Sequence, residues 1–187
     1  MSLYPPFVQL SDEIKSITGV DPLWVISCFT AEEPLRWYSS SSPEKMNVTP
    51  LADHFVEVEQ QAAGGRDVHV IGHSHGGWLA LQTSVKLTES IQLGGLWSID
   101  PISRVHCTPS RFTGCLEPPR DISAEQYQSV ADNSDIWHNF YQTETFYLRS
   151  GPISAADHNH RVAASHTRID TRPEVWDSVR ERILQKL

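Results

Sequence analysis

The chain has 187 residues and a mass of 21.1 kDa, enough for one domain with its own hydrophobic core. Hydrophobic residues make up 39% and charged residues 20%, a composition that excludes an intrinsically disordered chain. The formal net charge of −8 argues against a nucleic-acid-binding protein and against attraction to an anionic membrane. The composition and charge are compatible with an apolar substrate and with binding to a neutral lipid surface.

The chain shows no basic segment followed by an apolar run at its N-terminus, and no apolar run of 18 residues. We therefore expect neither a signal peptide nor a membrane-spanning helix, and a soluble protein. Cys28 lies in an apolar run and is expected to be buried. Cys107 and Cys115 lie eight residues apart in one loop, where a disulfide and two free thiols are both compatible with the sequence. The compartment is therefore left unknown, either cytoplasmic or reached by a non-classical export route.

In the first third of the chain, residues 7–17 predict a short helix, and the apolar run over residues 23–29 is typical of a buried strand. Residues 30–50, which contain four consecutive serines and a proline, are expected to form a loop. Residues 51–63 show apolar side chains at helical spacing, and two glycines end that predicted helix.

The sequence after the two glycines predicts strands that alternate with helices. Strands are expected over residues 67–72, 93–99, 140–148 and 161–164, and helices over residues 76–85, 123–130 and 173–187. Ser123 and Gln126 have the spacing of a capping box, and Thr171 is the predicted cap of the last helix. This order predicts an α/β fold of three layers, a reduced and mostly parallel sheet flanked by helices. We expect a single domain over residues 1–187, in which residues 102–135 form a small lid or excursion.

The motif that carries chemistry is Gly72-His73-Ser74-His75-Gly76, a G-x-S-x-G pattern between a predicted buried strand and a predicted helix. This context is the one that a nucleophile elbow requires. The turn is tight and strained at the serine, so a side chain two residues before or after it would clash, and glycine avoids the clash. The Ser74 hydroxyl then projects at a helix N-terminus, which favours developing negative charge.

A serine nucleophile needs a general base and an acid that orients the base. In this topology the chain order is serine, acid, histidine, and the base lies before the last helix. His166 lies there and is the predicted base; His158 and His160 are the alternatives.

Two carboxylates compete for the role of the acid. Asp100 ends the strand that follows the elbow helix, where open α/β sheets place ligands, and is favoured; Asp157 follows the next strand and is the alternative acid. For the oxyanion hole we expect the backbone N–H of His75 and that of Phe29 or Thr30, at the end of the first strand.

These residues together resemble the α/β-hydrolase superfamily, on its lipase and esterase side. Residues 70–77 are similar to the lipase form of the elbow, and Ser98–Pro101 to the aspartate-proline of some lipases. Residues 139–142 and 151–153, together with the segment around His166, are similar to the tail of bacterial lipase-like proteins. The chain lacks the first strands of a full eight-stranded sheet and a long lid insertion, which places it nearer to cutinase-sized hydrolases.

The sequence therefore predicts an esterase or lipase that uses Ser74, Asp100 and His166, with a small-molecule or lipid ester as substrate. A thioesterase and a non-catalytic binding module on the same scaffold are the alternatives. Two H-x-H pairs, at residues 73–75 and 158–160, also fit a metalloenzyme, but we expect no metal and no cofactor. No nucleic acid and no protein partner is expected, and contact with a membrane or lipid surface stays open.

Overall fold

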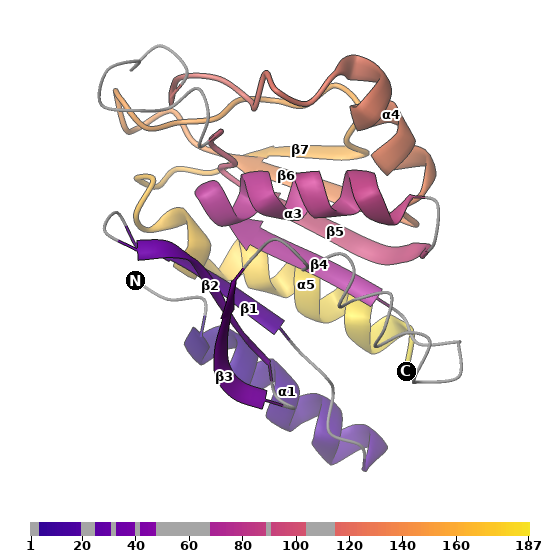
Figure 1. Ribbon diagram of the computed structural model, residues 1–187. Helices are drawn as coiled ribbons and strands as arrows, with labels where there is room; N and C mark the ends of the chain where they lie inside the picture. The colour runs from indigo at the N-terminus through magenta and orange to yellow at the C-terminus, as the bar shows by residue number, and fades with distance from the viewer. Residues whose placement is uncertain are drawn as a thin grey trace. The chain divides into compact units, whose positions relative to one another are not determined.

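The computed structural model describes residues 4–19, 25–30, 33–39, 42–47, 68–88, 91–103 and 115–187. For residues 4–8, 25–30, 33–39 and 42–47 it describes the backbone alone. Figure 1 labels the helices and strands. The chain divides into two compact units. One comprises Pro50–Ile169, and the other comprises Met1–Thr49 with Asp170–Leu187. The single domain expected over residues 1–187 stays a prediction.

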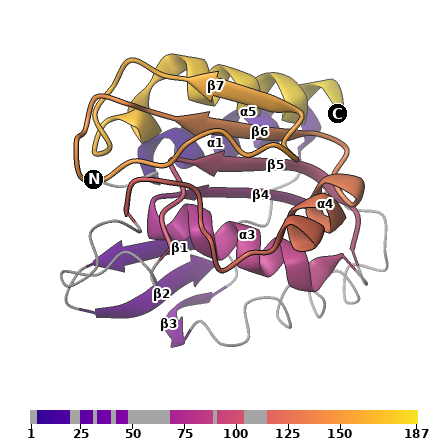
Figure 2. The same ribbon diagram turned by 90° about the horizontal axis from the view of Figure 1, so that it is seen from above.

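The unit Pro50–Ile169 contains a four-stranded sheet whose strands are all parallel (Figure 2). Its strands, in spatial order, are β4 (Val68–His73), β5 (Leu93–Ile99), β6 (Trp137–Tyr141) and β7 (His158–Arg161). The predicted α/β class with a reduced, parallel sheet is confirmed. Because parallel strands end at the same edge, the segments that follow β4, β5 and β6 meet there.

Helices α3 (His75–Leu87) and α4 (Ala124–Asp132) contact each other, and α3 also contacts β4 and β5. Apolar side chains form the core of this unit, among them Val70, Leu81, Leu96, Val130 and Trp137. The predicted capping box of α4 is confirmed. The Ser123 hydroxyl accepts the N–H of Gln126, whose side-chain oxygen accepts the N–H of Ser123.

Two strands of this sheet begin earlier than the sequence predicts. The strand expected over residues 140–148 is β6 and ends at Tyr141, because the side chain of Gln142 draws the next residues into a loop. The strand expected over residues 161–164 is β7, which consists of His158, Asn159, His160 and Arg161. This edge strand is polar and pairs with β6 alone, so it carries no hydrophobic pattern to reveal it.

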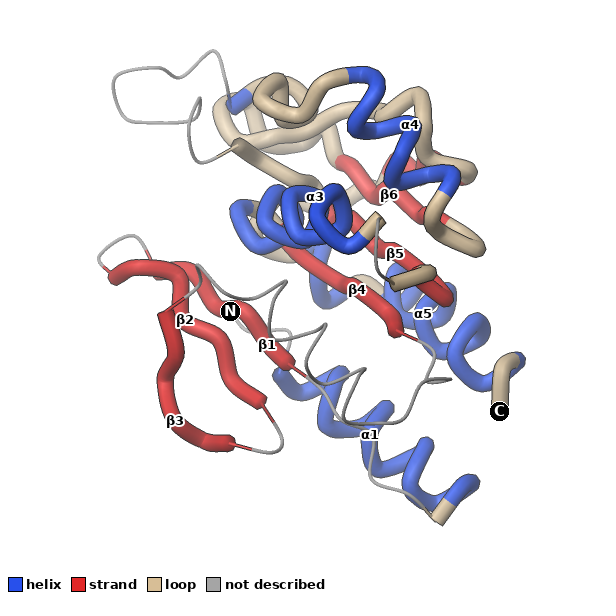
Figure 3. Tube along the Cα trace, turned by 45° about the vertical axis from the view of Figure 1, so that its right-hand side comes forward, coloured by secondary structure: helices blue, strands red, loops and turns tan. Residues whose placement is uncertain are grey.

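The other unit contains helices α1 (Tyr4–Thr18) and α5 (Pro173–Gln185) and an antiparallel sheet (Figure 3). Its strands are β1 (Val25–Thr30), β2 (Glu33–Ser39) and β3 (Ser42–Asn47). The loop predicted over residues 30–50 is therefore wrong. Ser and Pro residues favour loops, yet backbone pairing extends through this segment, as Ser39 pairs with Ser42 and Trp37 with Met46. The strand predicted over residues 23–29 corresponds to β1, which pairs antiparallel with β2.

Within this unit α1 and α5 contact each other, and Arg180 forms an ion pair with Glu13 that lowers the pKa of the carboxyl and raises that of the guanidinium. The predicted Thr171 cap of α5 is wrong. Thr171 ends a 3₁₀ turn, η2 (Ile169–Thr171), and the residue before α5 is an extended Arg172 that is followed by Pro173. The helix predicted over residues 51–63 lies outside the described residues. None of the described helices has both the length and the apolar character needed to cross a membrane.

Candidate functional site

The turn from β4 into α3 holds Ser74 in a strained conformation, with φ 59° and ψ −126°. Non-glycine residues rarely adopt positive φ, and such strain persists only where the surroundings enforce it. Here the Ser74 N–H donates to the carbonyl of Ile99 over 2.9 Å, and the Ser74 carbonyl accepts the N–H groups of Trp78 and Ile102, each at 3.1 Å. The end of β5 and the start of α3 therefore fix this turn from both sides.

Two glycines make the turn possible. A Cβ added at Gly72 would lie 2.2 Å from the carbonyl oxygen of Gly76 and 2.9 Å from the Cβ of Ala80. At Gly77 it would lie 3.1 Å from the Cα of Pro101, so α3 packs directly against the chain that leaves β5. The expectation that a side chain two residues before the serine would clash is borne out by the Gly72 geometry.

Three predicted site residues meet beyond the carboxyl ends of β4 and β5. Ser74 Oγ lies 2.8 Å from Nε2 of His166, and Nδ1 of the same ring lies 2.7 Å from Oδ2 of Asp100. Because a carboxylate only accepts, Nδ1–H donates to Asp100, which leaves Nε2 to accept the hydroxyl proton of Ser74. Asp100 is fully buried and His166 is 6% exposed, whereas Ser74 is half-buried. The arrangement is a continuous row of hydrogen bonds from a hydroxyl to a buried carboxylate.

The Asp100 carboxylate accepts two further hydrogen bonds. Oδ1 accepts the backbone N–H of Ser150 over 2.7 Å, and Oδ2 also accepts the side-chain amide of Gln142 over 2.9 Å. Asp100 itself has a positive φ of 42°, and its N–H donates to the carbonyl of Phe140. A buried carboxylate is tolerated only when such donors compensate for its lost hydration.

The loop after β6 also holds His166 in place. The His166 N–H donates to Oγ1 of Thr145 over 2.8 Å, and its carbonyl accepts Nε2 of His73 over 2.9 Å. The Gln142 side-chain oxygen accepts the N–H of Thr145, and its amide donates to the carbonyl of Leu148. Sequence reasoning missed Thr145 and the positioning roles of His73 and Gln142. The only available signal was that His73 and Gln142 lie in the segments that carry the family resemblance.

The alternative acid lies elsewhere in the sheet. The Asp157 carboxylate accepts the backbone N–H of Trp137 over 2.7 Å and so occupies the start of β6, whereas the ring of His166 donates to Asp100. The geometry therefore favours Asp100 as the partner of His166.

The alternative bases, His158 and His160, lie on β7. Nε2 of His160 is 3.0 Å from Nδ1 of His138 on β6, and burial together with the charge of His158 lowers the pKa of His160. The side chains of the other H-x-H pair diverge, because His73 donates to the carbonyl of His166 and His75 to the carbonyl of Ile102. Among the described residues, no three His, Cys, Asp or Glu side chains gather as a metal ion would require.

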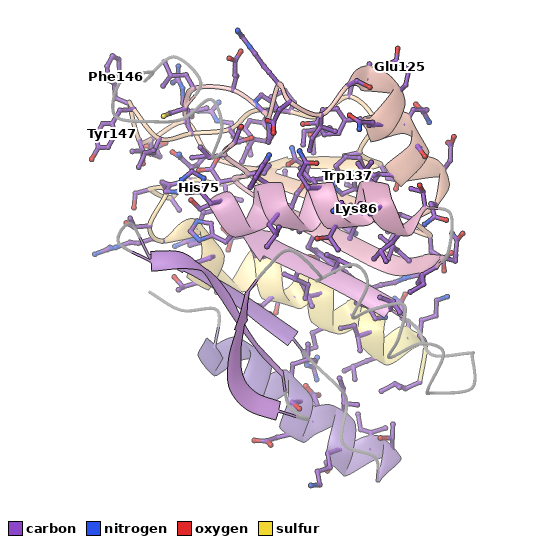
Figure 4. All side chains as sticks on the ribbon, viewed as in Figure 1. His75, Lys86, Glu125, Trp137, Phe146 and Tyr147 are labelled. Atoms are coloured by element: carbon purple, nitrogen blue, oxygen red, sulfur yellow. The ribbon has the colours of Figure 1, made fainter. Side chains whose placement is uncertain are left out.

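The two predicted oxyanion donors fall in different units. His75 is the first residue of α3 (Figure 4). Its Nδ1–H donates to the carbonyl of Ile102 over 2.9 Å, which fixes the ring. Its backbone N–H belongs to the first turn of the helix, where the helix dipole favours negative charge. Phe29 lies in β1 of the other unit, so its contribution stays a prediction.

Cys115 is buried and forms a disulfide. The side chains of both candidate partners, Cys28 and Cys107, lie outside the described residues. The pairing of Cys107 with Cys115 therefore stays a prediction.

The site combines a strained, half-buried hydroxyl, a ring nitrogen that can accept its proton and a buried carboxylate that orients the ring. Such a set can activate a serine for attack on a carbonyl carbon. A family model described as "Alpha/beta hydrolase family" matches residues 33–184, which is most of the chain. Comparisons with curated proteins and with solved structures gave no match.

Proposed function

Because the chain belongs to the α/β-hydrolase family, we propose that it is a serine hydrolase that cleaves carboxylic esters through an acyl-enzyme on Ser74. The observation that carries the proposal is the row of hydrogen bonds from Ser74 to His166 and from His166 to Asp100, at 2.8 and 2.7 Å. Family membership makes the chain a hydrolase; this row supports the finer assignment to acyl transfer at a serine.

In the first half of the reaction, Ser74 Oγ attacks the ester carbonyl carbon while Nε2 of His166 takes the hydroxyl proton. Asp100 keeps the ring in the tautomer that leaves Nε2 free to accept, and its charge stabilises the imidazolium that forms. When the tetrahedral intermediate collapses, the bond between the carbonyl carbon and the alcohol oxygen breaks. The alcohol leaves with the proton from Nε2, and the acyl group stays on Ser74.

The oxyanion that forms during the attack needs hydrogen-bond donors placed in advance. We assign the backbone N–H of His75 to this role because His75 opens α3 directly after Ser74. A second donor, the N–H of Phe29 or Thr30, stays a prediction from the sequence.

In the second half, a water molecule takes the place of the alcohol. Nε2 of His166 removes a proton from the water, the hydroxide attacks the acyl carbon, and the proton passes to Ser74 as the carboxylic acid leaves. The site ends in its starting state, and Ser74 and His166 carry the acyl group and the protons throughout the cycle.

We further propose that the substrate is a small-molecule or lipid ester. The net charge of −8 disfavours anionic substrates at long range, whereas it exerts little force on neutral esters. A thioester would follow the same steps with a thiol as the leaving group, and is the second candidate.

The proposal is tested by comparing Ser74→Ala with Ser84→Ala on p-nitrophenyl esters of increasing chain length. We expect Ser74→Ala to lose about 10⁶-fold in kcat, because the nucleophile is gone. Ser84 is a matched control on α3, since its buried hydroxyl has no hydrogen-bond partner among the described residues, and its removal is expected to leave turnover unchanged. Ester hydrolysis retained by purified Ser74→Ala would refute the proposal, and so would a wild-type protein that cleaves none of the esters.

A further inference from the structure

Two aromatic side chains project from the loop that follows β6. Phe146 is 83% exposed and Tyr147 is 59% exposed, and both extend away from the body of their unit (Figure 4). Leu116 is the third large hydrophobic residue of the unit Pro50–Ile169 that is exposed among the described residues. It lies on the neighbouring segment, because the Arg149 N–H donates to the carbonyl of Cys115 over 2.8 Å. Large exposed apolar groups gathered in one place mark an interaction surface, whereas scattered ones do not.

The base of this loop is fixed. Gln142 closes it by donating to the carbonyl of Leu148 over 2.7 Å and by accepting the N–H of Thr145. The Arg149 bond to Cys115 ties its end to the adjacent segment, in which Cys115 is held by a disulfide. The loop therefore presents its aromatic residues on a rigid support, and little conformational entropy is lost when they dock.

The same loop is attached to the proposed catalytic groups. Thr145, which directly precedes Phe146, accepts the His166 N–H, and Gln142 donates to Asp100. An apolar surface that bound Phe146 and Tyr147 would thus be held next to the segment that positions the base.

We propose that Phe146 and Tyr147, together with Leu116, form a docking surface for aggregated, zwitterionic lipid esters, an inference that rests on the proposed function. A projecting pair of rings fits a fluid surface that can part around it, and Tyr suits the polar boundary of such a surface with an apolar ring and a polar hydroxyl. The net charge of −8 opposes both an anionic lipid surface and a second copy of the chain, but not a zwitterionic one.

The test is flotation of the full chain with phosphatidylcholine vesicles, using wild type, Phe146→Ser/Tyr147→Ser and Ile17→Ser. Ile17 is a matched control because it is 58% exposed on α1, outside the loop. We expect the double variant to lose at least tenfold in vesicle partitioning, and Ile17→Ser to bind as the wild type does. Adding phosphatidylglycerol at low salt should weaken wild-type binding, as charge repulsion requires.

A second readout is the ratio of hydrolysis rates for one p-nitrophenyl ester above and below its aggregation threshold. The double variant should lower this ratio about tenfold. The single variant Phe146→Leu, in which Tyr147 is unchanged, should keep most of the wild-type ratio. A wild-type protein that does not float with the vesicles overturns the inference, and so does a double variant that binds equally well. A wild-type dimer that the double variant abolishes, without vesicle binding, would assign the surface to a second copy and likewise overturn it.

The two proposals fail separately. If Ser74→Ala abolishes turnover but no protein floats, only the docking surface is refuted. If flotation depends on Phe146 and Tyr147 but the wild type cleaves no ester, the proposed function is refuted and the docking surface is supported.

Discussion

At the scale of single residues, the buried Asp100 carboxylate is the group with the most demanding surroundings. Its side chain is fully buried, and its oxygens accept hydrogen bonds from the His166 ring, the Gln142 amide and the Ser150 N–H. Loss of any of these partners leaves a buried charge with a weaker set of donors, which is costly. We therefore expect the site to be sensitive to substitutions of residues that do not touch the substrate.

Asp100→Asn compared with Asp157→Asn tests which carboxylate serves His166. The amide at position 100 can present its NH₂ to Nδ1 and stabilise the wrong tautomer, so we expect kcat to fall about 10³- to 10⁴-fold. Asp157→Asn keeps an oxygen for the Trp137 N–H and is expected to cost about 1 kcal/mol of stability or less, with kcat unchanged. The measurements are steady-state kinetics and urea unfolding. The reverse pattern, with Asp157→Asn inactive, would make Asp157 the acid.

Gln142 is expected to act as a positioning residue. Gln142→Leu removes the donor to Asp100 and the closure of the loop that holds His166, so kcat should fall about tenfold while KM for a soluble ester stays constant. Gln82→Leu removes a comparable amide-to-carboxylate bond, to Asp121, away from the triad, and serves as the control. Equal effects of the two substitutions on kcat, or a change confined to KM, would count against the role of Gln142.

At the scale of elements, the passage from β4 to α3 requires glycine at position 72. We expect Gly72→Ala to lower the free energy of unfolding by about 3 kcal/mol, because a Cβ there meets a backbone oxygen that cannot move aside. Gly151→Ala is the control, since its Cβ would meet only Pro118 at 3.3 Å. Thermal and urea unfolding of both variants measure the difference. A Gly72→Ala protein as stable as wild type would show that the elbow is not tightly packed.

The elements that could be predicted are those whose burial leaves a pattern. The sequence predicts β4, α3 and β5 because each buries apolar side chains. It predicts the capping box of α4 because this motif depends only on neighbouring residues. The polar β7 and the hairpin of β2 and β3 are formed by backbone pairing with a neighbour, which no local pattern encodes. The same reason explains the site. Ser74, Asp100 and His166 follow from chain order and sheet topology, whereas Thr145 reaches His166 through a loop whose path the sequence does not specify.

At the scale of the whole molecule, the proposed catalytic residues lie within one compact unit. Ser74, Asp100 and His166 all belong to Pro50–Ile169, where a parallel sheet brings their segments to one edge. A chain of 187 residues thus accommodates the row of hydrogen bonds with only four parallel strands among its described residues. The acidic net charge is consistent with neutral esters as substrates.

The central claim, that Ser74 is the nucleophile, is tested most directly by labelling the native protein with a fluorophosphonate and locating the adduct by peptide mass spectrometry. We predict one adduct per chain, on Ser74, formed at a rate that Asp100→Asn strongly lowers. We predict no labelling of Ser74→Ala or of unfolded wild type. A native protein that remains unlabelled, or an adduct on another residue that persists in Ser74→Ala, would contradict it.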